Sequence, residues 1–275
     1  MGKQFKLGIV QIAVHENKDI AVDKAMENVA MLADRGANII VLPEMFNCPY
    51  ETHRFKEYAE AEGGATWTRM KEISKSKSVY LIGGSIPEKA GDQIFNTTFI
   101  FDPEGQQIAK HRKIHMLDID IQNGQYFRES DALSAGDAPT VVDTIYGKIG
   151  VAICYDIRFP ELARYMVKKG AQMLIYPAAF NMSTGPAHWE LLFRSRAVDN
   201  QVFAVGCAPA RNYDSSYISY GHSIVVNPWG DVIGELNEDE GFMIGNINFE
   251  EVTRIREQLP LLKHLKSEKY TSNQE

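Results

Sequence analysis

The sequence is poor in cysteine, with only Cys48, Cys154 and Cys207 among 275 residues. Three thiols cannot all pair within one chain, and a small secreted protein held together by disulfides would carry more of them. The chain also lacks a run of about 18 apolar residues, so no membrane-spanning helix is expected. Its first apolar stretch is short and contains Gln11, unlike the core of a signal peptide. We therefore expect a cytoplasmic protein in a reducing compartment, with no membrane partner.

Positive charge is not in excess, because 36 Asp and Glu residues outnumber 29 Lys and Arg residues and give a formal net charge of −7. Contacts to phosphates need a basic surface, so nucleic acid is not expected as a partner. The motifs G-x-S-x-G, G-x-G-x-x-G and the Walker loop are absent, which leaves serine hydrolases and nucleotide-binding proteins without local support. His111 and His115 lack the glutamate of H-E-x-x-H, so a zinc site is not expected. The sequence gives no reason for any other metal, nucleotide or flavin, and we therefore expect no cofactor.

Apolar residues make up 44% of the chain and charged residues 24%, which is ordinary for a globular protein. Short apolar runs typical of strands alternate with segments of helical spacing, and this alternation favours an α/β layer architecture. The predicted strands are 5–14, 38–42, 79–86, 149–154, 173–177 and 202–207; the predicted helices are 20–35, 67–77, 160–169 and 188–200. No linker divides the chain, so we expect one domain over residues 1–275, with a core from about 5 to 260 and a polar tail from Lys266.

Two similar turn signals occur in the two halves of the chain. Residues 98–109 read TFIFDPEGQQIA and residues 223–235 read SIVVNPWGDVIGE. In each, Asp or Asn is followed by Pro, one further residue and Gly, a combination that favours a tight turn between two strands. The recurrence indicates either a repeated core with antiparallel hairpins or the chance reuse of a common turn.

Cys154 follows the apolar run 148–153 and precedes a predicted helix. At the N-terminus of a helix a thiol has a lowered pKa and lies near backbone N–H groups that can stabilise an oxyanion. The alternative is a buried, inert cysteine. Cys48 and Cys207 lie in a loop and at the end of a strand of small apolar residues, and both are interpreted as structural.

Two charged residues are further candidates. Glu44 follows residues 39–43, where a buried carboxylate must be paired or functional; a loop carboxylate in solvent explains the pattern equally well. Lys113 lies in the segment AKHRKIH at 109–115, for which a solvated basic patch is the usual explanation.

Taken together, LPE at Glu44, HRKIH around Lys113 and CYDIRF from Cys154 resemble the nitrilase superfamily of carbon–nitrogen hydrolases in composition and order. The resemblance runs from about residue 5 to beyond residue 259. Longer segments resemble the omega-amidase branch of that superfamily; they are 46–50, 80–88, 112–120, 183–190 and 194–201. The resemblance implies a four-layer α-β-β-α sandwich and a homodimer formed through helices near the active site.

The resemblance also implies a mechanism for amide hydrolysis through a cysteine thioester. Cys154 is the implied nucleophile and Glu44 the group that moves the proton, while Lys113 and the backbone N–H of Tyr155 are implied to hold the oxyanion. Glu129 matches a second glutamate of the superfamily, which is implied to orient the lysine and the reacting amide. Without the resemblance, Glu129 would be interpreted as a surface charge.

Omega-amidases act on alpha-ketoglutaramate and alpha-ketosuccinamate, so the implied partner is a small keto acid amide that ends in a carboxylate. Arg158 could bind that carboxylate in a bidentate manner, with hydroxyl contacts from Tyr50 and Thr184. The alternative for Arg158 is a structural ion pair with Asp156 or Glu161.

Other functions stay open at this point. A related amidase could act on deaminated glutathione or on an N-carbamoyl compound, because substrate preference changes easily within one fold. A non-catalytic binding scaffold is a third possibility, although the presence of all three motif residues argues against it. Asn96 and Asn181 match the glycosylation pattern, which a cytoplasmic protein would not use. His188 is interpreted as a structural histidine.

Overall fold

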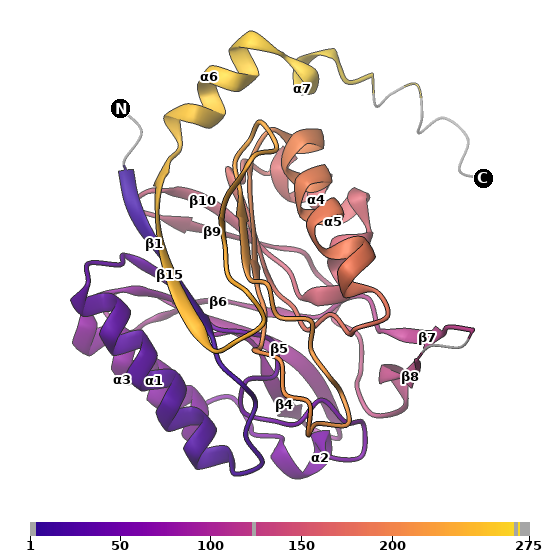
Figure 1. The fold of residues 1–275 in the computed structure, drawn as a ribbon. Helices are drawn as coiled ribbons and strands as arrows, with labels where there is room; N and C mark the ends of the chain where they lie inside the picture. The colour runs from indigo at the N-terminus through magenta and orange to yellow at the C-terminus, as the bar shows by residue number, and fades with distance from the viewer. Residues whose placement is uncertain (1–3, 123–124, 267–268, 270–275) are drawn as a thin grey trace.

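The computed structural model describes residues 4–122, 125–266 and 269. Two β-sheets lie face to face at the centre, and helices cover the outer face of each sheet (Figure 1). The expected four-layer α-β-β-α sandwich is therefore confirmed. The tail predicted from Lys266 lies almost entirely outside the described residues.

The first sheet has seven strands and the second has six. The first contains β1 (Gln4–Gln11), β2 (Ile39–Val41), β3 (Tyr80–Ile82), β4 (Ile86–Ala90), β5 (Gln93–Phe101), β6 (Gln107–Arg112) and β15 (Gly241–Asn248). The second contains β9 (Thr140–Thr144), β10 (Gly147–Val151), β11 (Met173–Pro177), β12 (Phe203–Cys207), β13 (Ile224–Val226) and β14 (Val232–Glu235). A separate hairpin is formed by β7 (Asp118–Asp120) and β8 (Tyr126–Arg128).

Five longer helices occur in the described residues, and all but α6 pack on a sheet. They are α1 (Lys18–Asp34), α3 (Ala65–Lys77), α4 (Pro160–Lys168), α5 (Gly185–Asn200) and α6 (Glu250–Gln258); α2 (Phe55–Tyr58) and α7 (Leu261–His264) are single turns. In the α1 sequence, Val22, Met26 and Val29 recur at helical spacing and are buried against the first sheet. The side chain of Asn17 accepts a hydrogen bond from the N–H of Ile20 and so caps the first turn.

The two sheets repeat one strand order. In the first, β1, β2 and β3 are parallel, β15 lies antiparallel beside β1, and the antiparallel hairpin β5–β6 follows β3. In the second, β10, β11 and β12 are parallel, β9 lies antiparallel beside β10, and the hairpin β13–β14 follows β12. The two recurrent turns of the sequence join the two equivalent hairpins, so the repeated core is the correct interpretation of that signal.

The inner faces of the sheets meet in one apolar layer. Leu7 and Ile9 of β1 and Val41 of β2 contact a cluster that includes Ile175 of β11 and Val205 of β12, all fully or almost fully buried. Burying a side chain of this size contributes about 1.5–3 kcal/mol relative to leaving it in water. This layer holds the carboxyl ends of the strands in both sheets at a fixed separation.

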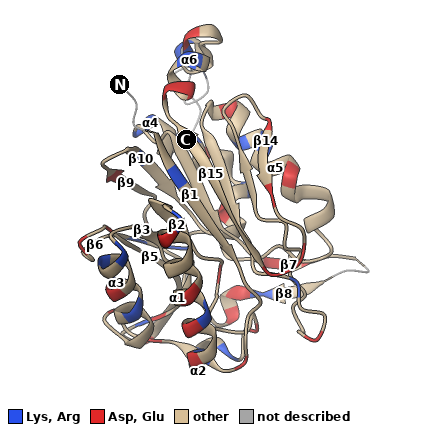
Figure 2. Ribbon diagram, turned by 60° about the vertical axis from the view of Figure 1, so that its left-hand side comes forward, with Lys and Arg blue, Asp and Glu red and all other residues tan. Residues whose placement is uncertain are grey.

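The outer surface carries charges of both signs. In Figure 2 acidic and basic residues both lie along α1 and α3, and some of them form ion pairs. Two of these pairs join the helices, at 2.7 Å between Arg69 and Asp23 and at 2.7 Å between Lys77 and Asp34. Within the described ranges, each helix is too short or too polar to cross a membrane.

The single strand predicted over residues 79–86 is wrong in its extent. Residues 79–86 form two strands, β3 and β4, which pair with the same edge of β5 on either side of a break at Gly83 and Gly84. Gly84 has a φ of +57°, and a Cβ atom there would lie 2.2 Å from the carbonyl oxygen of Pro43. The break therefore makes room for the loop that follows β2, and this loop carries Glu44.

Replacing Gly84 by alanine tests this close approach. Gly91 has a similar φ of +61°, but a Cβ atom there would meet nothing within 4 Å, so Gly91→Ala measures the backbone penalty alone, about 1–2 kcal/mol. We expect Gly84→Ala to lower the free energy of unfolding by about 3 kcal/mol or more, since it adds steric overlap to that penalty. Chemical denaturation of both variants provides the comparison. Equal losses of stability would contradict the proposed contact.

Candidate active site

Cys154 lies at a sharp bend after β10. The strand ends at Val151, and Cys154 opens a short 3-10 turn, Cys154–Arg158, before α4 begins at Pro160. The predicted strand through residue 154 is therefore too long, and the thiol does not lie directly at the N-terminus of the long helix. Cys154 has a φ of +46°, an uncommon conformation for a residue with a side chain, and such conformations persist where the surroundings impose them.

Lys113 follows β6 and is completely buried. Its Nζ lies 2.7 Å from Oε2 and 3.0 Å from Oε1 of Glu129, and 3.4 Å from Oε1 of Glu44. It also donates to the hydroxyl oxygen of Tyr50 at 3.1 Å. The ammonium is thus surrounded by two carboxylates and a phenol, and it does not form part of a solvated basic patch.

Glu44 follows β2 and is also completely buried. Its Oε1 accepts hydrogen bonds from the amide of Asn96 at 2.8 Å and the hydroxyl of Tyr50 at 3.1 Å. Its Oε2 accepts from the backbone N–H of Ala179 at 2.7 Å. Ala179 follows β11, the strand equivalent to β2 in the second sheet, so the two sheets meet at this carboxylate.

Glu129 is buried as well, which excludes its interpretation as a surface charge. Its Oε2 accepts from the backbone N–H of Leu117 at 2.7 Å in addition to the ammonium of Lys113. Tyr50 can donate its single hydroxyl proton either to Glu129, at 3.0 Å, or to Glu44, at 3.1 Å. The lysine therefore has a fixed position between the two glutamates.

The electrostatics of this cluster favour a charged lysine and a neutral phenol. Burial alone would lower the pKa of Lys113, but the negative charges of Glu129 and Glu44 outweigh it and raise that pKa. Burial raises the pKa of Tyr50, and the same two carboxylates raise it further. Lys113 is consequently a permanent cation that can face a developing negative charge.

The pKa of the Cys154 thiol differs from the expectation. Burial raises it, the nearby charge of Glu44 raises it further, and the opposing effect of Lys113 is smaller. The predicted lowering at a helix N-terminus is therefore wrong, because the thiol lies in a buried site beside a carboxylate. A neutral thiol next to a carboxylate can act as a nucleophile only if it transfers its proton as the sulfur attacks.

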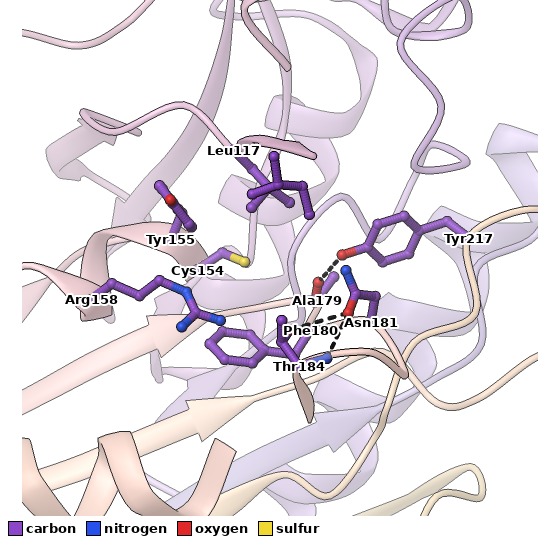
Figure 3. A pocket seen from close by; sticks show the side chains of 10 residues that line it. Leu117, Cys154, Tyr155, Arg158, Ala179, Phe180, Asn181, Thr184 and Tyr217 are labelled. Atoms are coloured by element: carbon purple, nitrogen blue, oxygen red, sulfur yellow. Dashed lines mark hydrogen bonds between the residues drawn. The ribbon is translucent and has the colours of Figure 1, made fainter. Parts of the chain in front are cut away.

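A cavity of about 180 Å³ opens at Cys154 (Figure 3). Its walls combine apolar side chains with a few polar ones, as is usual for sites that bind small molecules. The lining residues are Leu117, Ile119, Cys154, Tyr155, Arg158, Ala179, Phe180, Asn181, Thr184 and Tyr217. Four predicted site residues are among them, whereas Glu44, Lys113, Glu129 and Tyr50 lie in the buried cluster that adjoins Cys154.

Arg158 brings positive charge to this cavity. Its guanidinium lies over the rings of Phe180 and Tyr155, at 4.9 and 5.6 Å from their centroids, and Nη1 contacts Nδ1 of His188 at 3.2 Å. Among the residues that the structure describes, no carboxylate pairs with Arg158, so the predicted alternative of a structural ion pair is not found. Thr184 also lines the cavity, and its hydroxyl donates to Asn181 at 3.1 Å.

Asp156 connects the segment around Lys113 to the turn that begins at Cys154. This buried carboxylate accepts hydrogen bonds from the backbone N–H of Ile153 and of His115, both at 3.0 Å. It also contacts the ring nitrogens of His115 at 2.7 Å and of His111 at 3.1 Å. The two histidines flank Lys113 in the sequence, and both of their rings contact Asp156, two residues after Cys154.

The sequence did not identify Asn96, Asp156, Ala179 and Tyr217 as part of the site. Asn96 matched only a glycosylation pattern, yet it is buried against Glu44. The one sequence signal for Asn96 was its amide side chain among the mostly apolar residues of strand 93–101. Ala179 acts through its backbone N–H, and Tyr217 through a hydroxyl that donates to the Ala179 carbonyl at 2.5 Å. No side-chain pattern reveals a backbone donor.

The remaining predicted groups lie outside this arrangement. Cys48 and Cys207 are free, buried thiols that do not line the cavity. In the described part of the chain, no three His, Cys, Asp or Glu side chains are grouped so that they could hold a metal ion.

Comparison with known proteins agrees with this geometry. Residues 6–257 match the family model of the carbon–nitrogen hydrolases. The chain is 46% identical to omega-amidase NIT2 of Xenopus tropicalis, over 98% of this chain and 97% of that protein, and 44% identical to omega-amidase NIT2 of Homo sapiens, over 97% and 96%. The crystal structure of Saccharomyces cerevisiae Nit3, a member of the nitrilase superfamily, superposes with a TM-score of 0.86 at 41% identity, over 94% of this chain and 95% of that one. The chain therefore belongs to the carbon–nitrogen hydrolases of the nitrilase superfamily.

Proposed function

We propose that the protein is an omega-amidase that hydrolyses the terminal carboxamide of alpha-keto acid amides to the keto acid and ammonia. The observation that carries this proposal is the cavity at Cys154, which adjoins the buried cluster of Lys113, Glu44 and Glu129. Similarity over nearly the whole chain to proteins named omega-amidase supports the same activity.

In the first half of the reaction, the sulfur of Cys154 attacks the amide carbon while Glu44 accepts the thiol proton. Negative charge then develops on the amide oxygen, where Lys113 and the N–H of Tyr155 stabilise it. The Tyr155 N–H forms no hydrogen bond with any described residue and is free for this contact. Glu44 returns its proton to the departing nitrogen, the carbon–nitrogen bond breaks, and ammonia and a thioester remain.

In the second half, water attacks the thioester carbon and Glu44 accepts a proton from that water. The same oxyanion contacts act again, the carbon–sulfur bond breaks, and the proton returns to the sulfur of Cys154. Glu129, Tyr50 and Asn96 hold the charged groups in place, because each forms hydrogen bonds with Lys113 or Glu44. Glu44 thus serves as base and acid in turn, and no histidine is required.

Charge complementarity supports a substrate with a carboxylate. The cluster beside Cys154 contains one lysine and two glutamates, so it would repel an anion in the absence of a further cation. Arg158 supplies that cation on the cavity wall and has no carboxylate partner among the described residues. Thr184 and Asn181 add polar groups to the same wall. A keto acid amide fits a cavity with an amide-cleaving group at one place and a guanidinium at another.

The quaternary state and location belong to the same proposal. We expect a homodimer that forms through α5, since Leu191 is 61% and Val198 is 41% exposed on this helix. We also expect one cytoplasmic domain whose partner is a small-molecule substrate, with neither nucleic acid nor membrane bound.

The activity is tested by measuring ammonia release from alpha-ketoglutaramate. We expect the wild-type protein to turn over this substrate and Cys154→Ala to lose activity by at least about ten-thousandfold, because the nucleophile is absent. Deaminated glutathione and an N-carbamoyl amino acid serve as comparison substrates. Preference for either would favour a related amidase, and absence of turnover on every amide would favour a binding scaffold.

Arg158→Lys tests recognition of the substrate carboxylate. Lysine retains the charge but cannot form the planar bidentate contact. We expect KM for alpha-ketoglutaramate to rise about tenfold, equivalent to about 1.4 kcal/mol of binding, while KM for an uncharged amide of similar length stays the same. Steady-state kinetics on both substrates measure the two KM values. Equal losses on the two would argue against the carboxylate contact.

Asp156 has a positioning role in the proposed mechanism. Opposing effects act on its pKa, since burial raises it, but hydrogen bonds from His111 and His115 outweigh burial and lower the pKa overall. The carboxylate form therefore holds the segment around Lys113 against the turn of Cys154. An amide at this place would direct an N–H group at the backbone donors and disturb the distance between nucleophile and cation.

We expect Asp156→Asn to lower kcat by up to about a hundredfold, the effect of a misplacement near 1 Å, with little change in KM. The matched control is Glu88→Gln, which alters another buried carboxylate held by Arg112 and Lys110. The control should lose stability but keep kcat in the folded fraction. If both variants show the same kcat per folded molecule, Asp156 is structural only.

A further inference from the structure

A second, smaller cavity adjoins Glu44. Its volume is about 30 Å³, and Glu44, Tyr50, Ala210, Ser215 and Tyr217 are among the residues that line it. Glu44 and Tyr50 lie at its buried end, whereas Ser215 is only half-buried and lies toward the surface. A cavity needs about 10–15 Å³ to contain one water molecule, so this space holds one or two.

The two cavities share a wall but differ in which catalytic group they reach. Ala179 and Tyr217 line both, and the Tyr217 hydroxyl donates to the Ala179 carbonyl at 2.5 Å. Cys154 lines only the larger cavity, and Glu44 lines only the smaller one. Figure 3 shows the hydrogen bond between Tyr217 and Ala179 at the edge of the larger cavity. Glu44 is completely buried, and the smaller cavity borders it from a side that Cys154 does not line.

The presence of two cavities matters for the hydrolysis of the thioester. After ammonia leaves, the acyl group is bonded to Cys154 and lies in the larger cavity. Water must nevertheless reach Glu44, which removes its proton. The acyl chain obstructs the route through the larger cavity, while the smaller cavity stays free.

The hydrogen bonds of Glu44 leave one of its two oxygens less occupied than the other. Its Oε1 has contacts from Tyr50, Asn96 and Lys113, whereas Oε2 accepts one backbone hydrogen bond, from Ala179. A carboxylate oxygen has about two lone-pair sites, so Oε2 retains the capacity to accept a proton donor. The side chain of Ser215 adds a polar partner for water in this cavity.

We infer that the small cavity is a water site that supplies the hydrolytic water to the thioester from the side of Glu44. The inference rests on the proposed amidase mechanism. Water moves from this site to the position that ammonia vacates, its oxygen bonds to the thioester carbon, and Glu44 takes one proton. The carbon–sulfur bond then breaks, the sulfur regains the proton, and the keto acid departs through the larger cavity.

Filling the cavity tests the inference. We expect Ser215→Leu to slow the second half of the reaction, so that kcat falls about tenfold, equivalent to about 1.4 kcal/mol of barrier. The value of kcat/KM should stay unchanged, because it reports the steps up to thioester formation. Mass spectrometry of acid-quenched enzyme should detect the acylated protein as the main species. Ala210→Val, at a buried position of the same cavity, should act in the same direction.

Ser216→Leu is the matched control, since Ser216 is an exposed neighbour that lines neither cavity. It should behave like the wild-type protein. Wild-type turnover in both cavity variants, or a fall in kcat/KM without acylated enzyme, would overturn the water site while leaving the amidase proposal intact. A wild-type protein that releases no ammonia from any amide would instead contradict the proposed function itself.

Discussion

A buried ammonium between two buried carboxylates determines much of this structure. Removing Lys113, Glu44 and Glu129 from water carries a large desolvation penalty, and only close pairing with full hydrogen bonding offsets it. The surrounding chain supplies that pairing through Tyr50, Asn96 and the backbone N–H groups of Leu117 and Ala179. Losing one member of such a cluster destabilises a protein by about 3–5 kcal/mol. The cluster is therefore both the proposed chemical centre and a constraint on how the two sheets meet.

The members of this cluster come from segments far apart in the sequence. Glu44 follows a parallel strand of the first sheet, and the N–H that binds it belongs to Ala179, which follows the equivalent strand of the second. Lys113 follows the hairpin of the first sheet, and Asp156 ties that segment to the turn of Cys154. Because the sheets repeat one order and face each other, the ends of equivalent strands meet across the sandwich. The repeat thus explains how distant motifs assemble into one site.

The sequence predicted the layers and the main motif residues but not the connections between them. The helix around 20–35 and the strand 173–177 have strong apolar periodicity, and the structure places them within a few residues of the predicted bounds. The strand predicted over 79–86 was wrong because a break at Gly84 serves a contact with Pro43, which is distant in sequence. The raised pKa of Cys154 depends on burial and on Glu44, and neither effect is visible in local sequence.

The pairing of β15 with β1 has a consequence for how the chain reaches its fold. The two strands pair over eight residues, from Gln4 opposite Asn248 to Gln11 opposite Gly241. During synthesis, the edge of β1 that binds β15 therefore stays unpaired until residues 241–248 have left the ribosome. An unpaired strand edge invites association with other chains. Cys154 and both glutamates of the buried cluster are already present by then, so the pairing of β15 closes a sheet edge and adds no residue of the proposed catalytic site.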